Sequence, residues 1–206
     1  MFGTSLIAVH MFDTLSYFIQ TIYRWLLRCK YSRGFGIQSP SAYEFVRYVV
    51  NEHYPYYAYQ ELEEQMTDQP RMFRKLGRLF FRLANFWQPD EAIVSNLNLI
   101  PYIQRACRKT SVEKMNVFEF NCPQKQVLVI LDMDDLCLDV CCHAVFKSVS
   151  NEMLLVVTGI HSRKSYAQLW NEIITYPCCG VTYDLYWCGI IFFDKSKHKQ
   201  DFKINF

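Results

Sequence analysis

The run VLVIL at residues 127–131 and the run MLLVV at residues 153–157 determine the expected fold. Both are short and continuously apolar, as in strands of a parallel sheet that is covered on both faces. Helical patterns lie between apolar runs, at residues 101–108, 138–149 and 165–174. This alternation predicts an α/β fold with a Rossmann-like, mostly parallel sheet and helices on both faces.

Further short apolar runs extend the expected sheet. They lie at residues 92–94, 116–120, 181–186, 190–193 and 202–206. The segment YDLYWCGIIFF, residues 183–193, contains a glycine turn at Gly189, and the chain ends in a strand pattern. We therefore expect the final strands to pair as an antiparallel C-terminal hairpin on the parallel sheet.

The first 88 residues are expected to form a helical region that packs on an α/β core of residues 89–206, within a single domain overall. Apolar residues recur at helical spacing between residues 11 and 27, which predicts an N-terminal helical extension. Its polar face is not rich in Lys and Arg, so packing on its own domain is favoured over a membrane-surface or partner helix. Asp13, Gln20 and Arg24 interrupt the apolar run, so no membrane span is expected.

The composition is that of an ordinary globular domain. The chain has 206 residues, 51% of them apolar, and a formal charge of +2 that demands neither a nucleic acid nor an anionic membrane as partner. Nine cysteines are irregularly spaced, and the doublets Cys141-Cys142 and Cys178-Cys179 do not fit the ligand spacing of a zinc site. We expect reduced thiols in a cytoplasmic protein, and no metal site.

The segment at residues 70–87 predicts a basic amphipathic helix. Its cations are Arg71, Arg74, Lys75, Arg78 and Arg82. With the tyrosines of HYPYYAY, residues 53–59, they would suit a nucleic-acid-binding module. A solvated face on an ordinary helix is the favoured interpretation, because no aromatic residue is interleaved on the basic side of the helix. The tyrosines are expected to pack on the domain, as aromatic-rich connectors more often do.

Three segments and the C-terminal end resemble a known family. They are GFGIQSPSAYEFV (34–46), LFFRLANFWQPDEAIV (79–94), TGIHSRKSYAQLWNEIITYPCCGVTYDLYWCGIIFF (158–193) and KQDFKINF (199–206). Together they are similar to class I S-adenosylmethionine-dependent methyltransferases of the type found in Bacteroidetes. The resemblance implies that S-adenosylmethionine would be the cofactor, provided the family function is retained.

The chain departs from that family at the cofactor loop. In the family, the strand equivalent to residues 92–94 ends in an acidic residue and a glycine-rich turn, where the backbone approaches the cofactor closely. Residues 92–101, AIVSNLNLIP, contain neither glycine nor carboxylate. Asn96 and Asn98 could adopt a left-handed conformation and bend the turn, but they would not leave the room that glycine leaves.

A second departure is length. Only residues 96–126 separate the first strand of the core from the VLVIL strand. The family usually places two strands and three helices there, which this interval is too short to hold. We therefore expect that one strand–helix unit has been deleted.

Three ionisable residues match functional positions of the family. The resemblance implies that Glu119 would hold the ribose hydroxyls, with a solvated strand-end carboxylate as the alternative. It places Asp132 near the reacting centre, where an exposed acidic turn with Asp134 and Asp135 is favoured over a cation site. His161 is a candidate base, but it lacks the family's preceding acids, and a structural role is the alternative.

Three functions remain in view. The favoured one is a methyltransferase-like protein that has lost S-adenosylmethionine binding and acts as a pseudoenzyme or interaction module with an unidentified protein partner. The first alternative is an active methyltransferase with a cofactor loop rebuilt around Asn96, Asn98 and Glu119, and Asp132 and His161 as catalytic candidates. The second alternative is nucleic-acid binding without catalysis.

Overall fold

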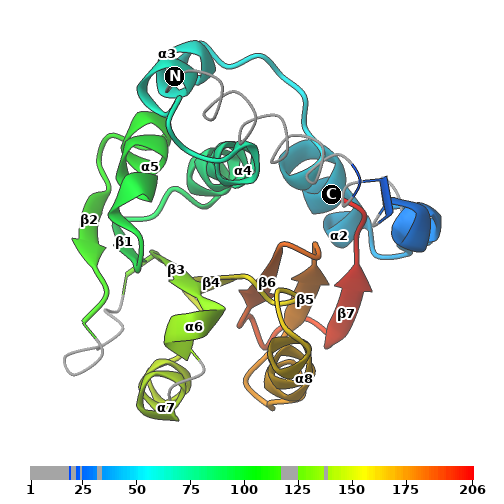
Figure 1. Ribbon diagram of the computed structural model, residues 1–206. Helices are drawn as coiled ribbons and strands as arrows, with labels where there is room; N and C mark the ends of the chain where they lie inside the picture. The colour runs from blue at the N-terminus through cyan, green and yellow to red at the C-terminus, as the bar shows by residue number, and fades with distance from the viewer. Residues whose placement is uncertain (1–18, 20–21, 24, 32–33, 117–124, 137–138) are drawn as a thin grey trace, which may run out of the picture.

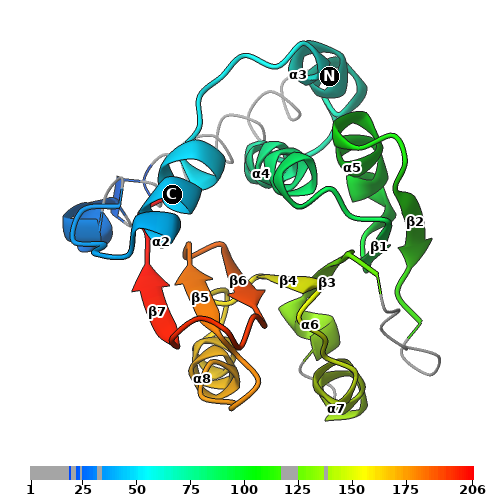
Figure 2. The ribbon, with the colours of Figure 1, turned by 180° about the vertical axis from the view of Figure 1, so that it is seen from behind.

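The chain forms a seven-stranded sheet between two layers of helices (Figures 1 and 2). The computed structural model describes residues 19, 22–23, 25–31, 34–116, 125–136 and 139–206. The strands are β1 (Glu91–Val94), β2 (Ser111–Lys114), β3 (Val127–Asp132), β4 (Met153–Thr158), β5 (Val181–Asp184), β6 (Cys188–Phe192) and β7 (Gln200–Lys203). Their spatial order is β2-β1-β3-β4-β6-β5-β7.

The helices cover both faces of this sheet, as expected. They are α2 (Pro40–Phe45), α3 (Ala58–Gln65), α4 (Arg71–Trp87), α5 (Ile100–Ala106), α6 (Met133–Leu136), α7 (Asp139–Lys147) and α8 (Lys164–Ile173), with the short turns η1 (Cys29–Tyr31), η2 (Val46–Val50) and η3 (Leu97–Leu99). Figure 1 shows α2, α4 and α5 on one side of the sheet and α7 and α8 on the other. The patterns at residues 101–108, 138–149 and 165–174 thus correspond to α5, α7 and α8.

Strands β3 and β4 are apolar up to their last residues, Asp132 and Thr158, because they lie between two cores. Leu128 and Ile130 belong to the core shared with α4, whereas Val129 and Leu131 belong to the core shared with α8. Successive side chains of a strand point to opposite faces, so a strand covered on both faces requires an apolar residue at every position.

The C-terminal end of the sheet is antiparallel, with two differences from the expectation. The expected turn at Gly189 is wrong: Gly189 lies inside β6, paired with Val157 and Asp184, and the chain turns at residues 185–187. Strand β6 pairs antiparallel with both β4 and β5, so the hairpin of β5 and β6 is confirmed. The last strand, β7, instead pairs parallel with β5. Strand β7 continues the sheet beyond β5 and does not form a second hairpin.

Between β1 and β3, the described residues form one strand, β2, which pairs parallel with β1. This strand has the polar sequence SVEK at the edge of the sheet, and it was missed because it has no apolar run. The strand expected at residues 116–120 lies almost wholly outside the described residues.

The regions before and after residue 88 share a core. Phe45, Val49 and Phe80 pack with Leu128, Leu154 and Tyr183 of the sheet. In the tyrosine-rich segment, Tyr56 and Tyr59 pack on Phe81 of α4, with ring centroids 5.1 and 5.3 Å away. These two tyrosines therefore follow the favoured interpretation, that of packing on the domain.

The described part of the N-terminal segment has apolar side chains at its surface. Its described apolar side chains are exposed to solvent: Ile19, Ile22, Tyr23, Trp25, Leu26 and Leu27. Arg28, by contrast, is buried. Within the described part of the chain, no helix is both long and apolar enough to cross a membrane.

Candidate functional site

The end of the sheet at which the parallel strands β1, β3 and β4 finish contains a cavity of about 700 Å³. The chain leaves β1 toward β2 on one side, whereas β3 lies on the other side of β1. Such a switch in strand order opens a crevice at the carboxyl ends of the strands, where α/β proteins bind ligands. Polar residues around the cavity are Ser95, Asn96, Asn98, Lys114, Asp132, Asp135 and Thr158. This cavity is therefore a candidate ligand-binding site.

Asp132 lies in this cavity, and its carboxylate is held by neighbouring donors. The Thr158 hydroxyl donates to Oδ2 at 2.7 Å, and the backbone N–H of Asp134 donates to Oδ1 at 3.0 Å. The Asp132 N–H donates in turn to Ser95 Oγ at 3.1 Å. Thr158, which stands where the resemblance expects an acid, therefore ties β4 to the end of β3.

The neighbouring Asp134 is also engaged. Asp134 accepts a hydrogen bond from the Tyr166 hydroxyl, which lowers the pKa of Asp134. Among the described residues, no three His, Cys, Asp or Glu side chains are placed to share a metal ion.

The turn after β1 is built differently from the expected left-handed bend. The Asn96 side chain accepts a hydrogen bond from the Asn98 N–H at 2.9 Å and caps the short helix η3. Asn96 has an extended backbone, with φ −109°, and the non-glycine residues with positive φ in the described chain are Gln88 and Tyr186. Asn96 and Asn98 therefore do not use the left-handed conformation that was open to them, because a side-chain cap bends the chain without positive φ.

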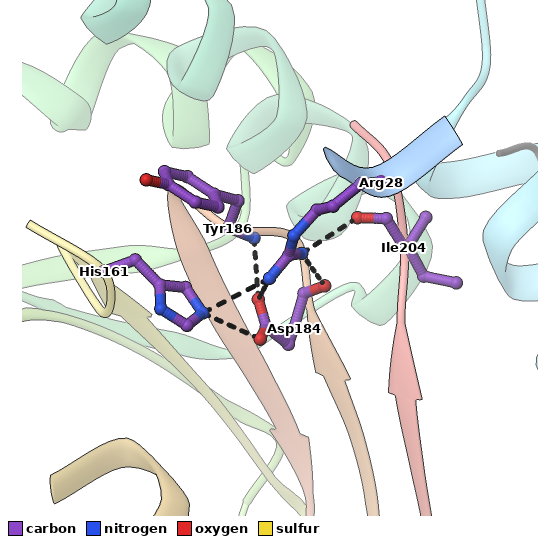
Figure 3. Close-up of polar contacts among 5 residues, drawn as sticks. All are labelled: Arg28, His161, Asp184, Tyr186 and Ile204. Carbon is purple, nitrogen blue, oxygen red and sulfur yellow. Dashed lines mark hydrogen bonds and ion pairs between the residues drawn. The ribbon is translucent and has the colours of Figure 1, made fainter. Parts of the chain in front are cut away.

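His161 lies in a separate polar group with Arg28, Asp184 and Tyr186 (Figure 3). Arg28 Nη2 pairs with Asp184 Oδ1 at 2.9 Å, and the two side chains are only 11% and 8% exposed. Arg28 Nη1 donates to the carbonyls of Asp184 and Ile204, at 3.0 and 3.3 Å. One arginine thus ties the N-terminal segment to the ends of β5 and β7.

The imidazole of His161 completes this group. Its Nε2 lies 2.8 Å from Asp184 Oδ2 and 3.3 Å from Arg28 Nη2. One ring nitrogen cannot both donate a hydrogen bond to Asp184 Oδ2 and accept one from Arg28 Nη2. The shorter contact favours an Nε2–H that is donated to Asp184. The ring also stacks on Tyr186, with centroids 4.9 Å apart.

The backbone of Tyr186 makes a turn that brings its N–H to the Asp184 carboxylate. Tyr186 has φ 73°, a left-handed conformation that is costly for a side chain of its size. Its N–H donates to Asp184 Oδ1 at 2.8 Å, and the Arg28 guanidinium lies 5.1 Å from the centre of its ring. The contacts of this turn with Asp184 and Arg28 hold it in place.

The pKa of Asp184 is set by opposing effects. Burial raises it, but the hydrogen bond from His161, the charge of Arg28 and the N–H of Tyr186 together outweigh burial and leave the pKa below its usual value. A lowered pKa in the folded state means that the ionised carboxylate stabilises the fold. That contribution is complete above the unfolded-state pKa and disappears as the pH falls through the folded-state pKa.

We expect this pH dependence to be measurable by urea unfolding. The difference in unfolding free energy between the wild type and Asp184→Asn should shrink as the pH falls from about 5 to about 3. Comparison with the variant removes the effect of acids such as Asp134, whose pKa is also lowered. A difference that grows over this interval would contradict the assigned role of the carboxylate.

The basic residues of α4 do not form one free surface. Arg82 is buried and donates to the carbonyls of Val49 and Val50, at 2.6 and 2.9 Å. Arg78 pairs with Glu63. Lys75 lies 4.2 Å from the ring centroid of Phe206, and burial lowers its pKa.

The structure thus divides the predicted site residues between two places. Asn96, Asn98 and Asp132 surround one cavity, whereas His161 belongs to the group around Asp184. Glu119 lies outside the described residues. Sequence reasoning missed Arg28 as a site residue and treated Asp184 only as part of a motif, although an acid in the apolar run YDLYW was a signal.

Comparison with solved structures gives likenesses that concern the fold alone. No family model matches the chain, and no curated protein matches its sequence. Among solved structures, the chain is similar to the SAH-bound methyltransferase PaMTH1 from Podospora anserina, with 9% sequence identity and a TM-score of 0.47. The match covers 78% of this chain and 98% of PaMTH1.

Proposed function

We propose that this chain is a methyltransferase-like α/β module that does not bind S-adenosylmethionine and acts through interaction with a protein partner. The turn between β1 and α5 is the observation that supports this proposal. A cofactor held at this end of a Rossmann-like sheet needs backbone N–H groups that it can approach closely, which is why glycines occupy such turns.

Here the turn presents side chains in place of glycines. Leu97, Asn98 and Leu99 all line the cavity, and Leu99 is buried, which fixes the turn against the core. The Asn96 carboxamide oxygen is occupied by the N–H of Asn98. The described residues of this turn do not fit the cofactor, so we derive no methyl-transfer step for this chain.

The catalytic candidates also have structural partners. Asp132 accepts hydrogen bonds from Thr158 and from the backbone of Asp134, which joins the ends of β3 and β4. His161 is held between Asp184 and the ring of Tyr186. These contacts favour a structural role for both residues over general acid–base chemistry.

The exposed N-terminal segment supports an interaction role. Tyr23, Trp25, Leu26 and Leu27 are all more than half exposed, and they follow one another closely in the chain. Exposed apolar side chains gathered in this way are typical of surfaces that meet a partner.

The test is calorimetric titration of the full chain with S-adenosylmethionine and S-adenosylhomocysteine (SAH). We expect no saturable heat at ligand concentrations up to about 1 mM. PaMTH1, whose structure holds SAH, serves as the positive control under the same conditions.

Saturable binding would overturn the proposal and favour an active enzyme with a rebuilt loop. The variant Glu119→Ala would then test that alternative. Because a carboxylate can accept two hydrogen bonds from the ribose diol, its loss should abolish binding. Unchanged affinity in Glu119→Ala would remove Glu119 from the site.

A further inference from the structure

A small cavity lies between α3 and α4, and α3 lies on the side of α4 that faces away from the sheet (Figures 1 and 2). Its volume is about 240 Å³, which is below the usual range for pockets that enclose a whole drug-sized molecule. All the side chains that line it are ionisable, and most are basic: Glu63, Arg71, Arg74, Lys75 and Arg78. The cavity is therefore positively charged.

The carboxylate in this lining does not neutralise the cations. Glu63 pairs with Arg78, which uses one positive charge. The other cations of the lining form no ion pair with any residue that the structure describes. Lys75 instead lies over the ring of Phe206, with its Nζ 4.2 Å from the ring centroid. Four cations less one carboxylate leave three positive charges in the lining without a counter-charge.

The place of these cations on α4 is unfavourable unless an anion joins them. Arg71, Arg74 and Lys75 lie at the start of α4, where the helix dipole already presents its positive end. An acidic residue in the first turn or a side-chain cap commonly offsets this charge. Helix α4 has neither, because its first turn contains no acid and its N-cap is Pro70. The negative group that this helix end favours is not supplied by its own first turn.

Arg74 lacks a partner even where it is buried. Its Nε is among the buried side-chain atoms without a hydrogen bond, and so is the hydroxyl of Tyr102. Burial raises the pKa of Tyr102, and the charges of Arg74 and Arg78 partly offset this effect, so the hydroxyl lies near both arginines. Buried polar atoms nearly always have partners. Because an arginine Nε–H can only donate, the partner that Arg74 lacks is an acceptor.

We propose that this cavity binds a phosphate group, either free phosphate or the terminal group of a small phosphate monoester. The guanidinium groups of Arg71 and Arg74 donate to the phosphate oxygens, and Lys75 and Arg78 add positive charge. Arginine suits this role because its planar fork can donate two parallel hydrogen bonds to one phosphate. The inference goes beyond the function proposed above and does not depend on it, because neither the cofactor nor the protein partner enters the argument.

The first experiment is calorimetric titration of the full chain in a low-salt buffer that contains no oxyanion. The probes are inorganic phosphate and glycerol 3-phosphate, with sodium chloride at matched ionic strength as the reference. We expect saturable binding of at least one phosphate probe with a Kd below about 1 mM. Binding of glycerol 3-phosphate at least as tight as that of phosphate assigns the site to a monoester, and weaker binding assigns it to free phosphate.

Substitutions locate the site. Arg74→Gln removes the buried donor and its charge, so it should weaken binding of the tighter probe about tenfold or more. Arg74→Lys keeps the charge but not the planar fork, and it should recover only part of this loss. Arg47→Gln is the matched control, because Arg47 is exposed, has no ion pair within the described chain and does not line the cavity. We expect Arg47→Gln to bind as the wild type does.

Stability gives a readout that a merely structural arginine would not produce. In low-salt buffer without phosphate, Arg71→Gln should raise the urea midpoint, because it removes a like charge from the positive end of α4. With phosphate at about 20 times its Kd the order should reverse, because the wild type gains more from binding than the variant does. Arg47→Gln should not show this reversal.

Four results would overturn the proposal. They are no saturable binding of either phosphate probe, binding that Arg74→Gln leaves unchanged, an equal loss in Arg47→Gln, and no reversal of the stability order for Arg71→Gln. A single-stranded oligonucleotide that binds more tightly than both probes, and loses its affinity in Arg74→Gln, would replace the small phosphate with a nucleic acid. Circular dichroism of each variant checks that the fold is retained.

Discussion

Replacement of Asp184 by alanine should destabilise the folded chain by about 3–5 kcal/mol, because it leaves the charge of Arg28 buried without its partner. The same substitution removes the acceptor of the His161 ring and of the Tyr186 N–H. The unfolding free energy of Asp184→Ala, measured by urea denaturation at neutral pH, gives the loss directly.

The pair of Lys109 and Asp90 is the matched control. These two side chains are 55% and 48% exposed, with the nitrogen and oxygen 3.5 Å apart. Exposed ion pairs contribute between about 0 and 1 kcal/mol, so Lys109→Ala should have little effect. Similar losses for the two variants would show that Asp184 is not held in a buried network.

A second comparison separates the charge from the packing. In the double variant Arg28→Met/Asp184→Leu, both charges are absent and apolar side chains fill the space. Buried ion pairs replaced in this way often recover most of the lost stability. We therefore expect the double variant to be more stable than Asp184→Ala.

The layers of this fold were predictable because β3 and β4 are apolar at every position before the last. A strand between two helical layers must bury both faces, and few other structures produce such a run. The edge strand β2 was not predictable from the same signal, because its SVEK side chains are mostly exposed. Pairing with β1 through the backbone suffices to make it a strand.

The polar groups were harder to predict than the layers. Arg28 and Asp184 are separated by 156 residues, and no spacing rule links a helix end to a strand end so far along the chain. The cavity that Asp132 lines was not predicted, because the sequence favoured an exposed acidic turn at Asp132, Asp134 and Asp135. The Asn96 turn was foreseen as unlike the family's, but its side-chain cap was not, because Asn bends a chain in more than one way.

Close packing at Gly189 gives the second large expected effect. Gly189 lies in the middle of β6, opposite Val157 of β4, and a Cβ placed on it would collide with the indole ring of Trp170. Trp170 is fully buried between α8 and the sheet, so its ring has no free space to enter. Overpacking in a core costs about 1–3 kcal/mol, and Gly189→Ala should fall at or above the upper end of this range because the obstacle is a rigid ring.

The partner of this contact provides the decisive comparison. In a Trp170→Leu background the smaller side chain leaves space beside β6, so Gly189→Ala should cost much less there than in the wild type. Such a difference between backgrounds is the coupling that a double-mutant cycle measures. If Gly189→Ala costs the same in both backgrounds, the strand backbone and not the indole ring requires glycine. A large coupling would show that Gly189 is required because the indole ring of Trp170, on α8, packs directly against β6.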